Sequence, residues 1–325
     1  MMKTKPLAAP ARRPQSIRAA YAFIAPYVLL FSLFIVIPVA IAIGLSFTNF
    51  NTIQMPSFVG FMNYVNLLTR DAIFMQYVLP NTILFAVIVG PGGYVLSFFL
   101  AWCLSQISKG PRTVLALLLY SPSMTSGVAM TVVWRILFSG DERGYLNALL
   151  LDLGWITQAI DFMGSQAHNA LLPRVMVILI NIWVGIPYLM LITTGILMNI
   201  PADLYESSRI DGANAWQQYT KITLPYMLFI TGPYLLTSFT NNINNFNVIY
   251  LLTGGAPTNA AASGAAGSVG YTDLLITWLF KITMGAESQY YMASVIGILV
   301  FLVVAIISLV VYNVLPSIKN EEDFQ

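Results

Sequence analysis

Reactive side chains are scarce in this chain of 325 residues, which has one cysteine and one histidine. Cys103 has no partner for a disulfide or a cysteine metal site, and we interpret it as a small apolar residue. His168 alone excludes a multi-histidine metal site and is expected to be a solvated or packing histidine. No glycine-rich loop of the G-x-x-x-x-G-K-S/T form is present. We therefore predict no metal ligands, no catalytic residues and no ATP or Mg²⁺ site in this chain.

Charge is scarce as well. Charged residues make up 9% of the chain, whereas soluble domains carry about 25%. Apolar residues make up 58%, and the mean hydropathy is +0.75. This composition predicts an integral membrane protein in contact with lipid, and the net charge of +2 is too small to indicate nucleic acid binding. The apolar runs hold no acids, which disfavours a carrier that uses membrane carboxylates.

Six apolar runs are close to the roughly 20 residues that a bilayer core requires. The first run is too long for the core of a signal peptide, so we expect it to stay attached. The sequence therefore predicts an all-α integral membrane fold with six transmembrane helices. The runs are 21–45, 81–104, 113–138, 175–198, 227–246 and 291–312.

Lysine and arginine predict that both termini lie inside the cell. Residues 1–20 hold five basic residues and no acid, and such a tail usually sets the orientation. With the N-terminus inside, the inner segments carry ten basic residues and the outer segments carry five. We divide the chain into a basic tail (1–20), a first span with its outer loop (21–76), a core (77–312) and a C-terminal tail (313–325).

Two long segments fall outside the cell in this topology. We expect 139–173 to fold into short helices that cap the bundle. The segment 253–290 contains the small-residue run 260–268, and we expect it to be flexible, without a core of its own.

The segment 199–225, between the fourth and fifth runs, is polar and lies in the cytoplasm in this topology. Pro201 suits the first turn of a helix, and Gly212 suits a helix stop. We predict a helix of two or three turns, a sharp bend at Gly212 and a second helix from about Trp216. Such a segment is a passive connector or a contact for another protein. Its charged residues are Asp203, Glu206, Arg209, Asp211 and Lys221.

The fifth run holds five asparagines within the seven residues 241–247. Ser238, Asn242 and Asn245 share one helical face at spacings i, i+4 and i+7. Hydroxyl and amide groups both donate and accept hydrogen bonds, which suits an uncharged sugar. The alternative is structural, because amides also join helices in membranes, at roughly 0.6–2 kcal/mol per bond.

The fourth run offers a weaker candidate. Gly185 and Tyr188 share a face beside Pro187, where a tyrosine ring can stack on a sugar. Proline-bent helices with aromatic residues are also ordinary in bundles, so both interpretations stay open. The polar stretch 121–126 in the third run is a further candidate of the same kind.

The polar segment also carries a recognisable spacing. Glu206-Ser-Ser, three residues, Gly212, nine residues and Ile222-Thr-Leu-Pro225 resembles the E-A-A–x3–G–x9–I-x-L-P signature of binding-protein-dependent ABC transporter permeases. Ser207 and Ser208 replace two alanines. The stretches 181–188, 201–206, 244–255 and 270–275 look like the larger membrane subunit of maltose-type importers, and the similarity covers roughly 80–312.

This resemblance implies the transmembrane domain of an ABC type I importer in a bacterial plasma membrane. It implies a permease subunit for maltodextrin or another oligosaccharide, working with a second permease, an ATPase dimer that binds ATP and Mg²⁺, and an extracellular solute-binding protein. The cytoplasmic loop would be a coupling helix. Residues carried over for the ATPase contact are Glu206, Ser207, Ser208, Asp211 and Gly212. Those carried over for sugar are Gly185, Tyr188, Ser238, Asn242 and Asn245, with Val184 as a lesser candidate.

Two other functions remain as alternatives. A self-sufficient secondary carrier or facilitator would show membrane acids or an inverted repeat, and neither is visible. A membrane scaffold would use the polar loop only to recruit a partner. Within the importer class, a smaller polyol or glycerol phosphate is also conceivable, although no basic residue lies beside the asparagines to favour a phosphate.

Overall fold

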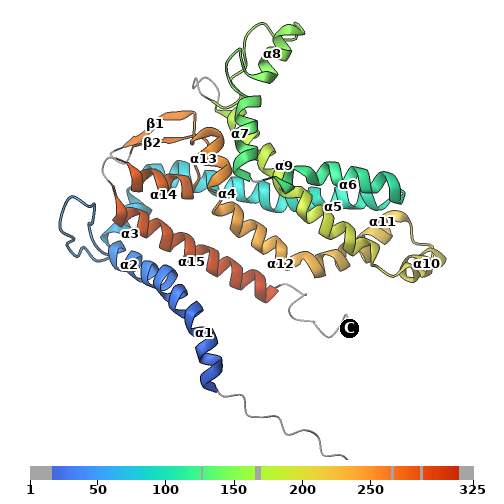
Figure 1. Ribbon diagram of the computed structural model, residues 1–325, viewed down its shortest axis with the longest axis horizontal. Helices are drawn as coiled ribbons and strands as arrows, with labels where there is room; N and C mark the ends of the chain where they lie inside the picture. Colours follow the sequence, from blue (N-terminus) through green and yellow to red (C-terminus); the bar gives the residue numbers. More distant parts are fainter. Residues whose placement is uncertain (1–16, 126, 165–169, 265–266, 286–287, 315–325) are drawn as a thin grey trace, which may run out of the picture.

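The computed structural model describes residues 17–125, 127–164, 170–264, 267–285 and 288–314. Within these ranges the chain is a bundle of long helices with one short β-hairpin (Figure 1). The predicted all-α class is confirmed apart from that hairpin. His168 and Ser126 lie outside the described residues, as do most of the two tails.

Among the described residues, five helices are long and apolar enough to cross a membrane. Four of them cover the runs that we predicted first, second, fourth and sixth. The helix that covers the fifth run, Ala215–Thr253, is longer than expected, because it continues from the polar loop to the outer segment. These five helices are Ala19–Ser46, Phe74–Ser105, Leu171–Met198, Ala215–Thr253 and Tyr290–Asn313.

The run at 113–138 is not one continuous helix. α6 (Lys109–Met124) ends where Thr125 takes an extended backbone with φ −88° and ψ 146°, and α7 (Gly127–Leu137) follows. Serine and threonine compete for backbone hydrogen bonds, which weakens a helix at this point. The expected single helix is therefore two helices. The count of six crossings and the orientation of the termini stay predictions.

Four π-helical segments bend the long helices, and all are associated with proline. Pro38, Pro80 and Pro225 each stand two residues after such a segment, and Pro91 lies inside one. A proline has no N–H and its ring crowds the carbonyl four residues earlier, so a wider turn keeps the helix continuous. The segments are η1 (Ser32–Val36), η2 (Phe74–Val78), η3 (Ile88–Gly92) and η4 (Tyr219–Thr223).

The centre of the bundle is formed by α5 (Gly93–Ser105), α9 (Leu171–Met198) and α12 (Leu224–Ile243). α5 packs along α9, and their contact buries Ala101 and Met190 completely. α12 crosses α4 (Leu79–Val87) and η3. This crossing is close, because a Cβ added to Gly90 would lie 3.3 Å from the Cα of Phe239.

The segment 253–290 contains a part that is folded around a buried carboxylate, outside the small-residue run 260–268 that we expected to be flexible. Asp273 has no exposed side-chain surface. Its oxygens accept from Lys281 Nζ at 2.6 Å, Thr277 Oγ1 at 3.0 Å and Gly270 N at 2.7 Å. These partners lie outside the run of small residues that suggested flexibility. The elements here are α13 (Asn247–Thr253), the antiparallel strands β1 (Thr258–Gly264) and β2 (Gly267–Gly270), and α14 (Leu275–Met284).

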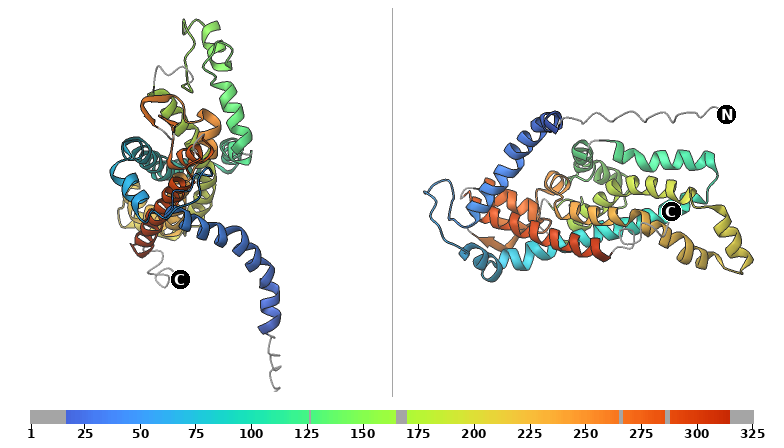
Figure 2. Two further views of the ribbon diagram at one scale, coloured as in Figure 1. Left: turned by 90° about the vertical axis from the view of Figure 1, so that its left-hand side faces the viewer. Right: turned by 90° about the horizontal axis from the view of Figure 1, so that it is seen from below.

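The segment 139–173 packs on the bundle only in part, where Phe162 and Met163 join a buried cluster that includes Ile180 of α9. Its helix α8 (Tyr145–Asp152) stands beyond α7 and projects away from the other helices (Figures 1 and 2). Asn147 is fully buried and organises the surrounding chain. Its Nδ2 donates to Ser139 O, Asp141 O and Ile160 O at 2.9–3.2 Å, and its Oδ1 accepts from Ile160 N at 2.9 Å.

The ends of the bundle differ in what they carry. In Figure 1 the hairpin lies at one end and α10 (Ala202–Ile210), with α11 (Ala215–Gln218), lies at the opposite end. α2 (Ile37–Ser46) packs on α15 (Tyr290–Val314), whereas α1 (Ile17–Phe31) leaves the bundle and buries no side chain in this chain (Figure 2). α3 (Met62–Thr69) joins the first long helix to the bundle at the hairpin end.

Candidate functional site

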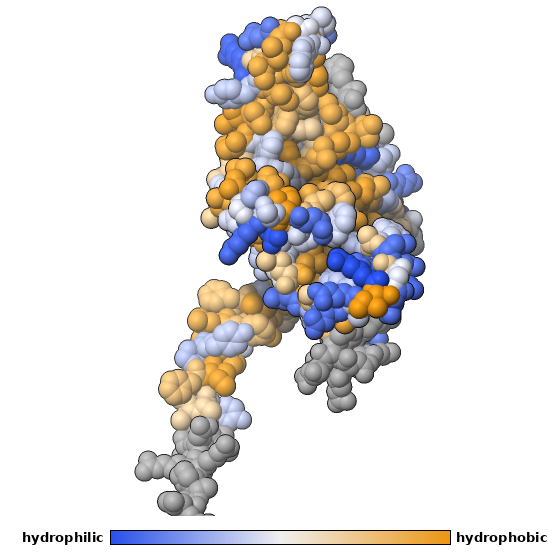
Figure 3. All heavy atoms as spheres, turned by 90° about the vertical axis from the view of Figure 1, so that its right-hand side faces the viewer, coloured by the Kyte–Doolittle hydropathy of each residue, from blue (hydrophilic) through white to orange (hydrophobic). Residues whose placement is uncertain are grey.

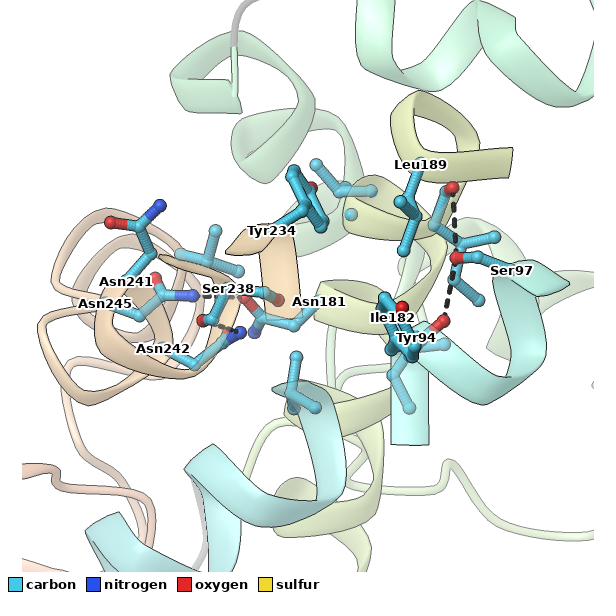
Figure 4. A pocket seen from close by; sticks show the side chains of 16 residues that line it. Tyr94, Ser97, Asn181, Ile182, Leu189, Tyr234, Ser238, Asn241, Asn242 and Asn245 are labelled. Carbon is cyan, nitrogen blue, oxygen red and sulfur yellow. Dashed lines mark hydrogen bonds between the residues drawn. The ribbon is translucent and has the colours of Figure 1, made fainter. Parts of the chain in front are cut away.

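A polar cavity of about 220 Å³ lies between α9, α12 and the helix formed by η3 and α5 (Figure 4). Its walls combine amides, hydroxyls, aromatic rings and aliphatic side chains, and none of its lining residues is charged. The lining residues are Val89, Gly93, Tyr94, Ser97, Asn181, Ile182, Val184, Gly185, Ile186, Leu189, Tyr234, Ser238, Asn241, Asn242, Asn245 and Val248.

The predicted face of α12 lines this cavity. Ser238, Asn242 and Asn245 all border it, together with Asn241, which the helical spacing placed beside them. Figure 4 shows Ser238 and Asn242 of α12 and Asn245, just beyond its end, grouped near Asn181 of α9. The three side chains that the i, i+4, i+7 spacing selects therefore lie together at the end of α12.

The amides of this group make different bonds. Asn245 Nδ2 donates to Asn181 Oδ1 at 2.7 Å, which joins α12 to α9. Asn181 Nδ2 donates to Val177 O at 2.8 Å within α9. Asn242 Nδ2 donates to Ser238 O at 2.8 Å within α12. Among the described residues, the Oδ1 atoms of Asn242 and Asn245 and the hydroxyl of Ser238 stay available to a ligand.

On α9, Gly185 and Val184 border the cavity, but Tyr188 does not. The Tyr188 ring lies 6.0 Å from that of Tyr234, measured between centroids, and its side chain is half exposed. Tyr234 itself lines the cavity. The tyrosine rings that border the cavity are therefore those of Tyr94 and Tyr234, and Tyr188 contacts the Tyr234 ring.

Two lining residues on α5 were not predicted. The Tyr94 hydroxyl hydrogen-bonds the Thr231 hydroxyl on α12, and Ser97 Oγ donates to Ile186 O on α9 at 3.3 Å. Both residues are buried, and Figure 4 shows them on the side of the cavity away from the asparagines. Their i, i+3 spacing within an apolar run was a signal that could have identified them.

The stretch 121–126 contributes one contact near this region, although its residues are not among those that line the cavity. Ser123 Oγ donates to Val184 O at 2.9 Å, which joins α6 to α9 next to Gly185.

The polar loop at the other end has the predicted helix–bend–helix form. α10 ends at Ile210, Asp211 follows as its C-cap, and Gly212 has a left-handed φ of +81°. The second helix starts at α11, where Asn214 and Gln217 form a reciprocal capping box with both bonds at 2.8 Å. α11 then continues through η4 into α12.

Hydrogen bonds tie α10 to the base of α12. Gln218 Nε2 donates to Ser208 Oγ at 2.8 Å and to Tyr205 O at 3.1 Å. The hydroxyls of Tyr205 and Thr223 lie 2.8 Å apart. Ser207 instead donates within its own helix, to Leu204 O at 3.2 Å. Of the two serines that replace alanine in the signature, Ser208 alone makes a bond between the two helices.

The outer surface of α10 is free within this chain. Glu206, Ser207, Asp211 and Gly212 are exposed, and Ile210 beside them is 87% exposed. Figure 3 looks onto this end and shows hydrophilic residues gathered around it. Behind α10 a hollow of about 450 Å³ separates Glu206 and Arg209 from the ends of α5 and α9.

The sequence pattern of the binding-protein-dependent transport system inner membrane component family matches residues 16–320. The chain belongs to this family. The permease is 30% identical over 318 residues to the maltodextrin transport system permease protein MalC of Streptococcus pneumoniae, which covers 93% of this chain and 70% of that protein. It is 32% identical over 308 residues to the galactooligosaccharides transport system permease protein GanP of Bacillus subtilis, covering 91% and 69%.

A solved structure shows the same fold. The permease matches a chain of a bacterial alginate ABC transporter, crystallised with a periplasmic protein bound to alginate pentasaccharide, with a TM-score of 0.73. The match covers 93% of this chain and 96% of that one at 22% identity, so it is a likeness of fold. The permease is therefore a membrane component of a transport system and not an enzyme. Transport by members of this family depends on a binding protein.

Proposed function

We propose that this permease forms half of the pathway of an ATP-driven oligosaccharide importer, with maltodextrin as the leading substrate. One observation carries the proposal. An uncharged cavity of hydroxyls and amides lies between α9 and α12, and the loop that connects these two helices holds the permease signature.

The chemistry of the cavity favours a neutral sugar. The free Oδ1 atoms of Asn242 and Asn245 accept from sugar hydroxyls, and Ser238 both donates and accepts. Tyr234 supplies a flat apolar face for a pyranose ring. Gly185 leaves room for the sugar to approach the backbone of α9. The names of the maltodextrin and galactooligosaccharide relatives support the same substrate class.

The cytoplasmic loop provides the coupling. Glu206, Ser207, Ser208, Asp211 and Gly212 form the contact with the ATPase, which binds ATP and Mg²⁺ in its own subunits. Closure of the ATPase dimer moves α10, and the bonds from Tyr205 and Ser208 pass that movement to the base of α12. α12 then opens the asparagine cavity toward the outside, where the solute-binding protein releases its sugar. Direction arises because the sugar binds the two states with different affinity.

Reconstitution of the complete transporter tests this proposal. We expect proteoliposomes with the permease, its partner permease and the ATPase to accumulate maltotriose only when ATP and the sugar-loaded binding protein are both present. Glu206→Lys should leave the complex assembled and abolish the stimulation of ATP hydrolysis by sugar. Maltotriose uptake without ATP would instead identify a facilitator, and normal uptake by the Glu206→Lys variant would refute the coupling role.

A further inference from the structure

A second cavity lies at the outer end of α12, between α7, α13 and α14. Its volume is about 510 Å³, more than twice that of the asparagine cavity. Binding pockets for small molecules usually measure about 300–1,000 Å³, so the second cavity falls in the common range and the asparagine cavity is smaller than that range. Its lining residues are Arg135, Tyr250, Leu251, Thr253, Gly254, Phe280, Lys281, Met284 and Gly285.

One wall of this outer cavity is aromatic. The rings of Tyr250 and Phe280 lie 5.0 Å apart at 70°, and Phe246 stacks on Tyr250 at 4.9 Å and 15°. Phe246 also contacts Phe280, with centroids 5.1 Å apart. Each ring is therefore held by the other two, so a ligand that stacks on this wall loses little freedom in ordering it.

Two cationic residues also line this cavity, Arg135 and Lys281. Arg135 on α7 is exposed and has no hydrogen-bond or ion-pair partner in the part of the chain that the structure describes. Lys281 is bound to Asp273 and still exposes 27% of its side chain. An unpaired arginine is costly in lipid, so this cavity faces water or the membrane interface. Five guanidinium N–H groups in the same cavity as aromatic rings are suited to a sugar ring with its hydroxyls.

The two cavities follow one another along the chain. Asn245 lines the inner cavity and Tyr250 the outer one, and only the short break 244–246 separates α12 from α13. At a helical rise of about 1.5 Å per residue, their backbones are on the order of 10 Å apart. A ligand that extends outward from the asparagines therefore reaches the aromatic wall.

We propose that this outer cavity is a second carbohydrate-binding site, which holds the sugar units of an oligosaccharide that the inner cavity does not accommodate. Tyr250 and Phe280 stack on a sugar ring, and Arg135 hydrogen-bonds its hydroxyls. This inference rests on the proposed function. Its consequence is selectivity by length, because a disaccharide fills the inner site and leaves the outer site unused.

The test compares sugars of two lengths in the complete reconstituted transporter. The variants are Arg135→Gln and Tyr250→Leu. The matched controls are Arg143→Gln and Tyr145→Leu, which change exposed outer residues that do not line the cavity. Loss of one stacking contact of about 0.5–1.5 kcal/mol predicts a roughly two- to ten-fold fall in maltohexaose uptake for Tyr250→Leu. Maltose uptake should stay within two-fold of the wild type in both variants.

The outcomes separate this site from the proposed function. An equal loss of maltose and maltohexaose uptake would show a structural role, and uptake equal to that of the controls would show no role. Either result overturns the outer site while wild-type uptake still supports the importer. A loss that follows the fraction of anionic lipid in the vesicles would assign Arg135 to lipid headgroups and also overturns it. If the wild type takes up neither sugar, the proposed function fails and the outer site fails with it.

Discussion

At the scale of single residues, neighbouring asparagines on α12 use their amides differently. Asn245 Nδ2 donates a hydrogen bond to Asn181 Oδ1 of α9, whereas Asn242 Nδ2 donates to Ser238 O of its own helix. Asn181 is buried, so its Oδ1 would have no ready substitute for that donor. The structural and the ligand interpretations of these amides are therefore compatible, since each amide has a second atom that faces the cavity.

This difference predicts separable effects of two alanine variants. Asn245→Ala should lower the stability of the permease by about 0.6–2 kcal/mol, the usual range for a hydrogen bond between membrane helices. Asn242→Ala should change stability little, because it removes a bond within one helix. Thermal unfolding of the purified complex measures both. Equal midpoints for the two variants would contradict the assignment of the interhelical bond to Asn245.

Sequence spacing located the polar face of α12 but not every residue of the cavity. The face of one helix follows from its periodicity alone, which is why Ser238, Asn242 and Asn245 were found together. Whether Tyr188 or Tyr234 borders the cavity depends on how α9 and α12 cross, and no local pattern encodes that crossing. The contributions of Tyr94 and Ser97 depend on α5 packing along α9 for the same reason.

At the scale of elements, α10 and the base of α12 behave as one bonded unit. Gln218 reaches back to Ser208 and Tyr205, and Tyr205 meets Thr223. Gly212 makes the turn between them and leaves open space around its Cα. The bend and the bonds together give α10 a fixed orientation relative to the helix that carries the asparagines.

The bond from Gln218 predicts different effects for the two signature serines. Ser208→Ala removes an interhelical bond of about 0.5–1.5 kcal/mol and should weaken sugar-stimulated ATP hydrolysis roughly two- to ten-fold. Ser207→Ala removes only a bond within α10 and should have the smaller effect. Rates of ATP hydrolysis with and without sugar-loaded binding protein measure the difference. A larger loss for Ser207→Ala would refute this role of Ser208.

The left-handed backbone of Gly212 gives a second prediction at this scale. A side chain at φ +81° costs about 1–2 kcal/mol for most residues and less for asparagine. No atom lies within 4 Å of an added Cβ, so crowding does not contribute. Gly212→Val should therefore impair coupling more than Gly212→Asn does. The number of sugar molecules transported per ATP hydrolysed measures this coupling. Equal ratios for the two variants would contradict the role of the left-handed backbone at Gly212 in coupling.

The bend at Gly212 was predictable from sequence, and the polar stretch 121–126 marked a bent point where the helix breaks at Thr125. The fold of 253–290 was not predictable. Proline, glycine and the capping residues act locally, so their spacing is sufficient. The fold of 253–290 depends on Asp273 meeting Lys281 and on Asn81 Nδ2 donating to Asp273 O at 2.7 Å, across 192 residues. A flexible-looking composition does not reveal such a distant partner.

At the scale of the whole molecule, the hairpin and α10 lie at opposite ends of the structure, and the predicted topology places the hairpin end outside the cell. The lone Cys103 makes this arrangement easy to test. After Cys103→Ala, single cysteines can be placed at the exposed positions Tyr145 and Asn214. A membrane-impermeant maleimide added to intact cells should label Tyr145→Cys and leave Asn214→Cys unlabelled. The reverse pattern would contradict the inside location of the termini.

α1 exposes a large apolar surface, because residues 19–31 are all exposed in this chain. Its apolar side chains require lipid or the partner permease around them.

The most direct test of the central claim is maltotriose uptake by the complete transporter carrying Asn242→Ala together with Asn245→Ala. We predict that the complex still assembles and hydrolyses ATP in response to the binding protein, while uptake falls at least ten-fold, the effect of about 1.4 kcal/mol. Asn247→Ala is a matched control, since this exposed asparagine does not line the cavity. Uptake equal to that of the control would contradict the claim that sugar passes along the asparagines of α12.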